Sequence, residues 1–180
     1  MKVIGVVPAR MAASRFPGKP LYPILGRPML EHVFLRAKMY NDWDRLVLAT
    51  CDLEIEQFAK EKSFPVIMTG AHHKRALDRI AEAVKNLDEE VAEDDIVVCL
   101  QGDEPMMRPD MIDAVVVPLQ ENSSIPCTVL AMHITEKTIW LNPDTVKVIS
   151  NDAGEVLYTS RAPVPYCNGE FSPNLLARRI

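Results

Sequence analysis

Short apolar runs alternate with helical patterns along the first 120 residues of this chain. Four runs are apolar and rich in β-branched residues, as buried strands are; they cover 3–7, 45–50, 65–68 and 95–101. Between and after them, apolar side chains recur with a period near 3.6, which predicts helices over 28–40, 53–62, 77–87 and 108–120. Strands that alternate with helices in this way predict βαβ units. We therefore expect an α/β fold with a three-layer, mainly parallel, Rossmann-like sheet.

The pattern changes after residue 120. Three strand-like runs follow with only short links between them, "CTVLAMHIT" (127–135), "VKVIS" (146–150) and "VLYTS" (156–160). They predict an antiparallel or mixed extension of the sheet. A length of 180 residues suits one domain. We expect a single domain over 1–180, with a ligand-binding βαβ part at 1–120 and the extension at 121–180.

Composition and charge exclude several classes of function. A net charge of −5 argues against non-specific nucleic-acid binding, which needs a broad basic face. No stretch approaches the roughly 18 apolar residues of a membrane span. Pro8 and Arg10 interrupt the first apolar run, which favours a buried strand over a secretory signal. The four cysteines are scattered, without metal-ligand spacing, and fit a reduced, cytoplasmic setting.

Positive charge is concentrated near the start of the chain. The first thirty residues carry five cations and no acid, so the remaining 150 carry a net charge of −10. Three of these cations lie in one loop, "PARMAASRFPGKP" (8–20), which leaves the carboxyl end of the first predicted strand. Small residues there let backbone N–H groups approach a ligand closely. The loop therefore predicts a polyphosphate site with Ala9, Arg10, Arg15 and Lys19; the alternative is a surface loop with incidental charges.

The common phosphate motifs do not explain this loop. Lys19 is followed by Pro20, which excludes a P-loop, and no G-x-G-x-x-G is present. A second group, "QGDEP" (101–105), ends the strand predicted at 95–101 and lies at the same sheet edge. A carboxylate at Asp103 is a natural Mg²⁺ ligand beside bound phosphates, although it could instead cap the following turn. Together with the basic loop it predicts a Mg²⁺ site.

Four stretches in this order, "PARMAASRFPGKPL", "QGDEP", "NPDTVKV" and "SRAPVP", resemble the 3-deoxy-manno-octulosonate cytidylyltransferase (CMP-Kdo synthetase) family. The resemblance implies a nucleotidyltransferase fold, Mg²⁺ as cofactor and a homodimer. The implied reaction joins CTP and an acidic sugar, Kdo or a related one, to give a CMP-sugar and pyrophosphate.

The resemblance also implies roles for individual residues. Arg10, Lys19 and Asp103 match catalytic positions, with Asp103 as the metal ligand. Arg161 of "SRAPVP" falls near the sugar-acid site. The positions that match the nucleotide site are Ala9, Arg10, Arg15, Lys19, Arg79 and Gln101.

Two departures from the family pattern keep an alternative open. Arg75, Ala76 and Leu77 stand where the family usually has Ser-Gly-Thr, so Lys74 and Arg75 form either a solvated helix entry or a reshaped pocket. The chain stops at Ile180, before the expected sugar-binding region, so we expect an incomplete sugar half and poor turnover. The alternative function is a nucleotide-binding homologue with weakened catalysis that acts as a binding or regulatory module.

Overall fold

The computed structural model describes residues 1–12, 16–168, 171 and 178–179 of the chain. It divides into two compact units, Met1–Pro126 and Cys127–Ile180, and each is described here by itself. The division falls six residues later than the change of pattern in the sequence, which lies after residue 120. No helix among the described residues is long and apolar enough to span a bilayer.

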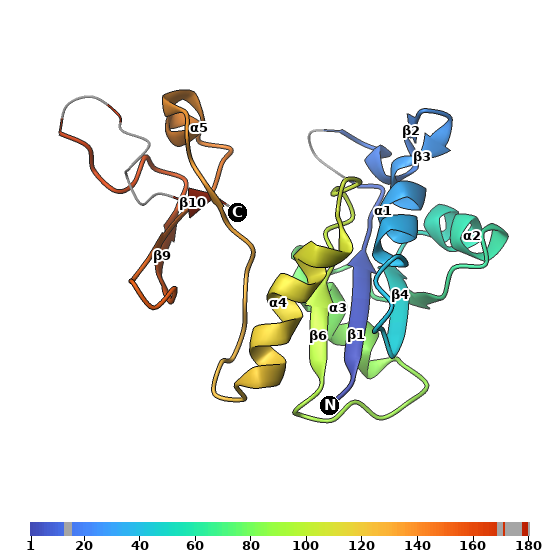
Figure 1. The fold of residues 1–180 in the computed structure, drawn as a ribbon. Helices are drawn as coiled ribbons and strands as arrows, with labels where there is room; N and C mark the ends of the chain where they lie inside the picture. Colours follow the sequence, from blue (N-terminus) through green and yellow to red (C-terminus); the bar gives the residue numbers. More distant parts are fainter. Residues whose placement is uncertain (13–15, 169–170, 172–177, 180) are drawn as a thin grey trace. The chain divides into compact units, whose positions relative to one another are not determined.

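A four-stranded parallel sheet forms the centre of the first unit (Figure 1). Its strands are β1 (Val3–Pro8), β4 (Arg45–Thr50), β5 (Val66–Met68) and β6 (Ile96–Cys99), in the spatial order β5-β4-β1-β6. In the middle of β1, Gly5 pairs with Leu46 on one side and Val98 on the other. The mainly parallel α/β fold is confirmed, and these four strands lie where the apolar runs predicted them.

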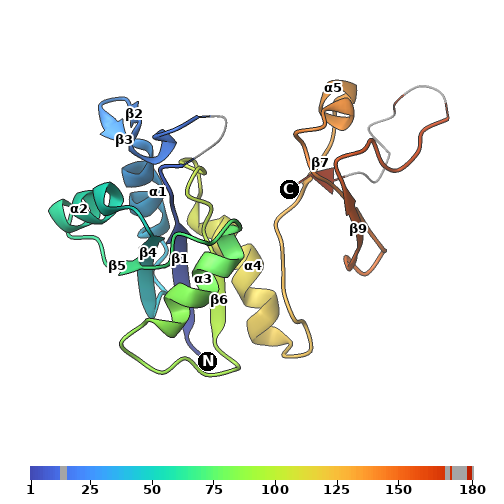
Figure 2. The same ribbon diagram turned by 180° about the vertical axis from the view of Figure 1, so that it is seen from behind.

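Helices cover both faces of this sheet, which makes three layers (Figures 1 and 2). One face packs against α1 (Met29–Ala37), α2 (Leu53–Glu61) and α4 (Pro109–Glu121). The other packs against α3 (Ala76–Lys85). Because successive strand residues point to opposite faces, Val3 and Val7 of β1 enter the first layer, whereas Ile4 and Val6 enter the second. Burial on both faces explains why the strands are continuously apolar.

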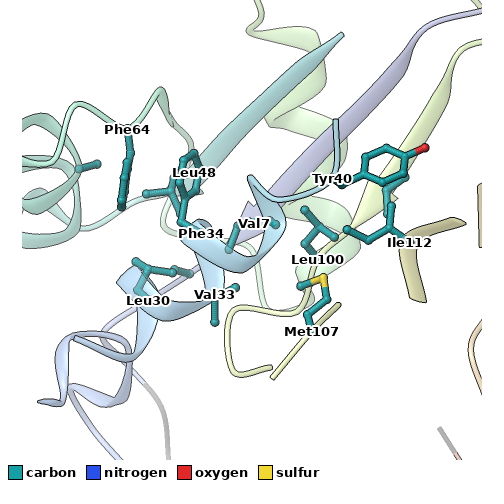
Figure 3. Close-up of a cluster of buried hydrophobic side chains, with 14 of the residues drawn as sticks. Val7, Leu30, Val33, Phe34, Tyr40, Leu48, Phe64, Leu100, Met107 and Ile112 are labelled. Carbon is teal, nitrogen blue, oxygen red and sulfur yellow. The ribbon is translucent and has the colours of Figure 1, made fainter. Parts of the chain in front are cut away.

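The larger core cluster lies between the sheet and α1, α2 and α4 (Figure 3). Aromatic rings fill one part of it: Phe34 of α1 stacks on Phe64 with ring centroids 4.2 Å apart. Leu100 and Met107 extend the same cluster to the segment that follows β6. Because these two buried side chains flank Asp103 in the sequence, they hold the backbone of its segment against the core.

Three small elements between β1 and α1 were not predicted: a 3₁₀ turn η1 (Lys19–Leu21) and the short strands β2 (Pro23–Ile24) and β3 (Arg27–Pro28). Pro28 was expected as the first helical residue of the next helix. It is instead the N-cap of α1, with an extended backbone (φ −52°, ψ 142°), and it pairs with Pro23 across the β2–β3 ladder. The helix consequently begins one residue later.

The second unit contains a separate antiparallel sheet of order β7-β10-β8-β9. Its strands are β7 (Met132–His133), β8 (Lys147–Ser150), β9 (Val156–Ser160) and β10 (Arg178–Arg179), and a short helix α5 (Lys137–Leu141) follows β7. The predicted antiparallel strands are thus present but form a sheet of their own. The strand expected over 127–135 was wrong for most of its length: Val129 and Leu130 are exposed and pair with no strand in the part of the chain that the structure describes.

A buried lysine lies at the start of β8 in this second sheet. Lys147 is 0% exposed, and its ammonium donates to the carbonyl oxygens of Asn142 at 2.6 Å, Thr145 at 3.0 Å and Arg161 at 2.8 Å. Burial, and secondarily the positive charge of Arg161, lower the pKa of this lysine. Three carbonyl acceptors offset part of the cost of taking its charge out of water.

Candidate functional site

A cavity of about 270 Å³ opens at the carboxyl edge of the parallel sheet. Three segments supply most of its lining: 8–10 with 19–20 at and after the end of β1, 101–103 after β6, and 73–76 at the start of α3. Arg79 of α3 and Met29 of α1 complete it. In the sheet, β4 lies on one side of β1, and β6 lies on its other side. The cavity therefore occupies the point where the strand order reverses, which is where open parallel sheets bind ligands.

The basic loop after β1 is fixed at both ends by hydrogen bonds that its backbone N–H groups donate. Ala9 N–H donates to the carbonyl of Ala49 at 2.9 Å, and Met11 N–H donates to the Asp52 carboxylate at 2.8 Å. The N–H of Gly18 closes the loop on the Met11 carbonyl at 3.0 Å, in the left-handed conformation (φ 76°) that glycine adopts without strain. This frame holds the backbone beside Arg10 against the sheet.

Lys19 and Asp103 reach each other across the mouth of this loop. The Lys19 ammonium lies 2.8 Å from one carboxylate oxygen of Asp103, and both side chains are substantially exposed, at 37% and 51%. Gly102 brings the two strand ends together, because a Cβ there would lie 2.5 Å from the Pro8 carbonyl oxygen. The glycine is thus needed for close backbone contact between the segments that follow β6 and β1.

Arg79 is a buried cation in this site. It is 3% exposed, and its guanidinium donates to the Thr69 hydroxyl, to the Gly70 carbonyl at 3.5 Å and to the Cys51 thiol at 3.4 Å. Among the described residues, no carboxylate lies within ion-pair distance of it. A buried charge normally requires a counter-charge, so this arginine, which lines the cavity, favours an anionic ligand there.

The segment that departs from the family pattern forms one wall of the cavity. Lys74 and Arg75 are exposed and also line the cavity, so they are solvated and at the same time part of the pocket. Arg75 is the N-cap of α3 but makes no side-chain capping hydrogen bond. Among the residues that the structure describes, one carboxylate lines the cavity, that of Asp103, together with five cations: Arg10, Lys19, Lys74, Arg75 and Arg79.

The structure brings most of the predicted site residues together. Ala9, Arg10, Lys19, Arg79, Gln101 and Asp103 all line the one cavity. Arg15 lies outside the described residues. Arg161 belongs to the second unit, where its guanidinium donates to the Pro143 carbonyl at 2.9 Å and lies 3.9 Å from the Asp144 carboxylate.

The sequence predictions gave no role to two residues that shape the site. Asp52 anchors the basic loop through Met11, and its signal was its place two residues after a predicted strand, at the same sheet edge. His73 lines the cavity and hydrogen-bonds Glu82 on α3. A histidine nine residues from a glutamate gives no recognisable spacing, so only the folded loop shows this pair.

The strand order and the cation-lined cavity define an α/β protein with the nucleotidyltransferase fold. The cytidylyltransferase family model matches residues 4–179. A 3-deoxy-manno-octulosonate cytidylyltransferase of Nitratidesulfovibrio vulgaris (strain DP4) is 44% identical over 90% of this chain and 63% of its own length. The same enzyme of Syntrophus aciditrophicus (strain SB) is 38% identical over 96% of this chain and 68% of its own length.

A solved CMP:2-keto-3-deoxy-manno-octonic acid synthetase in complex with CTP is 32% identical to this chain, with a TM-score of 0.87. The likeness covers 100% of this chain and 72% of that one. The chain belongs to the cytidylyltransferase family, in its 3-deoxy-manno-octulosonate cytidylyltransferase branch. It spans a little under two thirds of the Nitratidesulfovibrio relative.

Proposed function

We propose that this chain provides the nucleotide site of a cytidylyltransferase that joins CTP to an acidic sugar, 3-deoxy-manno-octulosonate or a related one. The observation that carries the proposal is the cavity at the sheet switch point, where five cations face one carboxylate. A nucleoside triphosphate carries the complementary negative charge. The relatives named for this reaction support cytidine as the base and an acidic sugar as the acceptor.

The charged residues of the cavity have two roles in the proposed reaction: the cations stabilise the leaving group, and the carboxylate holds the metal. In the proposed reaction a sugar hydroxyl oxygen forms a bond to the α-phosphorus of CTP while the bond from that phosphorus to the β-phosphate oxygen breaks. The hydroxyl proton goes to solvent, and pyrophosphate leaves with the negative charge. Arg10, Lys19 and Arg79 line the cavity from two sides and would stabilise this charge as it develops.

Asp103 is the group that would hold Mg²⁺. One exposed carboxylate beside a cationic cavity fits this ion, which commonly takes one or two protein carboxylates and completes its shell with water and substrate phosphates. When bound, the ion would polarise phosphate oxygens. The Lys19 ammonium now contacts the same carboxylate, so ligand binding would exchange that contact for one to phosphate.

A homodimer and a cytoplasmic location complete the proposal. Several large apolar side chains are exposed in the second unit, which supports a surface that packs against another one: Met132, Leu157, Tyr158 and Tyr166. Sedimentation equilibrium would measure the oligomeric state, and a chain that stays monomeric at high concentration would contradict the dimer.

Calorimetric titration with nucleotides, combined with an assay of pyrophosphate release over a panel of acidic sugars, tests the proposed function. We expect CTP to bind more tightly with Mg²⁺ than without it, and pyrophosphate to appear slowly and only when CTP and an acidic sugar are both present. Equal binding of CTP, UTP and ATP would contradict cytidine specificity. CTP binding without any pyrophosphate release would instead indicate a nucleotide-binding module.

The variant Asp103→Asn tests the metal role, with Glu104→Gln as its matched control. The amide is nearly isosteric with the carboxylate but lacks the charge that a hard dication requires. We expect Mg²⁺ to strengthen CTP binding to wild type and to Glu104→Gln, but not to Asp103→Asn. An unchanged Mg²⁺ response in Asp103→Asn would refute Asp103 as the ligand.

A further inference from the structure

The loop between β5 and α3 gathers three side chains of types that bind transition metals. His72 and His73 come from the loop, and Glu82 comes from the second half of α3. One ligand atom from each lies within 4.8 Å of the others. The two imidazole rings lie close together, with centroids 4.1 Å apart. Neighbouring residues in an extended segment would point apart, so the turn at this position is what makes them converge.

Gly70 determines the geometry of this cluster. A Cβ at Gly70 would lie 2.4 Å from Nδ1 of His72, so the imidazole packs directly on the glycine backbone. The Gly70 N–H also donates to both oxygens of Glu82, at 3.0 and 3.1 Å, and aims the carboxylate at the loop. His73 Nε2 hydrogen-bonds one of the same oxygens. These contacts, the His73 hydrogen bond first and the Gly70 N–H second, lower the pKa of Glu82.

We propose that His72, His73 and Glu82 form a binding site for one transition-metal dication, for which Zn²⁺ is the best match. Two imidazole nitrogens and one carboxylate oxygen are a common ligand set for Zn²⁺, which leaves a fourth position for water or another ligand. Mg²⁺ is a poor match, because it prefers an octahedral shell of oxygen atoms. The ion would replace the hydrogen bond between His73 and Glu82, and the proton of that bond would pass to solvent.

The position of the cluster gives the site a structural consequence. Lys74 and Arg75 directly follow His73 and line the large cavity. Arg79 lies one helical turn before Glu82 and donates to the carbonyl of Gly70, the residue whose N–H holds that carboxylate. A bound ion would therefore tie the loop to α3 and fix the cationic wall of the cavity. This site is separate from the Asp103 carboxylate and does not depend on which ligand the cavity takes.

Equilibrium dialysis against Zn²⁺ in excess Mg²⁺, with quantification of bound metal, tests the proposal. We expect one Zn²⁺ per chain in wild type. His72→Ala and Glu82→Gln should each weaken binding by at least about tenfold, the loss seen even for groups that only support a ligand. His32→Ala is the matched control, because His32 hydrogen-bonds the Ile24 carbonyl away from this loop. Co²⁺ bound to wild type should show the visible absorption of a four-coordinate ion, and this absorption should be lost in His72→Ala.

The two variants guard against a loss of folding. His72 is exposed, so its truncation removes no core contact, and Gln at 82 keeps an acceptor for the Gly70 N–H. Equal Zn²⁺ binding by wild type and both variants would overturn the proposal. So would binding that persists in His72→Ala but disappears in Cys127→Ser, because the metal would then be held by an exposed thiol.

Discussion

Lys19 and Asp103 carry the two opposite charges that the proposed ligand has to separate. Ion pairs with this degree of exposure contribute at most about 1 kcal/mol. A triphosphate with its dication offers each side chain a stronger partner, since charge-assisted contacts to phosphate contribute about 1.5–3 kcal/mol each. Exchange of partners is therefore favourable, and the pair keeps both side chains positioned at the mouth of the cavity.

We predict that Lys19→Ala weakens CTP binding by at least about tenfold while binding of cytidine, the nucleoside, changes little. The reason is that the ammonium contacts phosphate rather than base. Calorimetric titration with both ligands measures this difference, and Lys60→Ala on α2, where the lysine pairs with Glu56, provides the control. Equal losses for CTP and cytidine would refute the assignment of Lys19 to the phosphates.

The individual site residues were predictable where they directly follow a strand. Arg10 and Asp103 lie just after apolar runs whose carboxyl ends share one sheet edge, so topology alone brings them together. The contacts that orient them were not predictable. The Met11–Asp52 hydrogen bond and the proximity of Gly102 to Pro8 join segments more than 40 and 90 residues apart, and no local pattern encodes such pairs.

Asp95, which directly precedes β6 and contacts Lys2 before β1, offers a pH-dependent test of stability. Its carboxylate accepts hydrogen bonds from the N–H groups of Lys2 at 2.6 Å and Ala92 at 2.9 Å. These bonds, with Lys2 first, lower the pKa of Asp95 from its ordinary value of 3.8. A lowered folded-state pKa means that the stabilisation is complete above pH 3.8 and is lost as the pH falls through the lower folded value.

We therefore predict that Asp95→Asn lowers the urea midpoint of unfolding at neutral pH, and that the difference from wild type shrinks below pH 3.8. The matched control is Asp94→Asn, because Asp94 is the exposed neighbour in the same loop. A difference between wild type and Asp95→Asn that stays constant down to the acid limit would show that the hydrogen bonds do not favour the ionised carboxylate.

At the scale of elements, prediction succeeded where burial determined the pattern. The four parallel strands are buried on both faces, so their sequences are continuous apolar runs with clear ends. In the second unit much of β9 is exposed, so apolar residues there do not distinguish strand from loop. The run 127–135 illustrates this, because its apolar residues predicted a strand, whereas among the described residues its ladder partners are limited to those of Met132 and His133. The helix α5 has only five residues, too few for a helical period to be seen in the sequence.

We predict that Gly102→Ala destabilises the first unit by roughly 1–3 kcal/mol, the usual cost of forcing extra volume into a packed contact. The added methyl group would meet a backbone carbonyl, which cannot rotate away as a flexible side chain could. Urea unfolding measures the stability, and the shift of the segment bearing Asp103 should also weaken the Mg²⁺ dependence of CTP binding. Unchanged stability would show that the two strand ends separate at little cost.

In the second unit we predict that Lys147→Met lowers stability by roughly 2 kcal/mol. Three carbonyls would lose their donor, although relief from burying a charge offsets part of that loss. Fluorescence of Trp140 in a Trp43→Phe background follows this unit alone, since Trp43 lies in the other unit. Lys137→Met, at an exposed position of α5, is the control. Equal unfolding midpoints for Lys147→Met and Lys137→Met would show that the hydrogen bonds from Lys147 to the three carbonyls add nothing to stability.

For the whole molecule, the net charge is −5, but five cations line the cavity. This difference affects the rate at which an anionic ligand associates. Such an arrangement produces electrostatic steering: polyanions are repelled from most of the surface and drawn to one opening. We predict that the association rate constant of a fluorescent CTP analogue falls steeply with ionic strength, because the Debye length shrinks from about 10 Å at 0.1 M salt to about 3 Å at 1 M.

Stopped-flow mixing measures this rate constant, and the matching uncharged nucleoside analogue should show a nearly flat salt response. Equal salt dependence for both analogues would rule out steering. With steering, the acidic surface contributes to ligand selection before any contact forms, because it reduces futile collisions of phosphorylated metabolites everywhere except at the opening of the cavity.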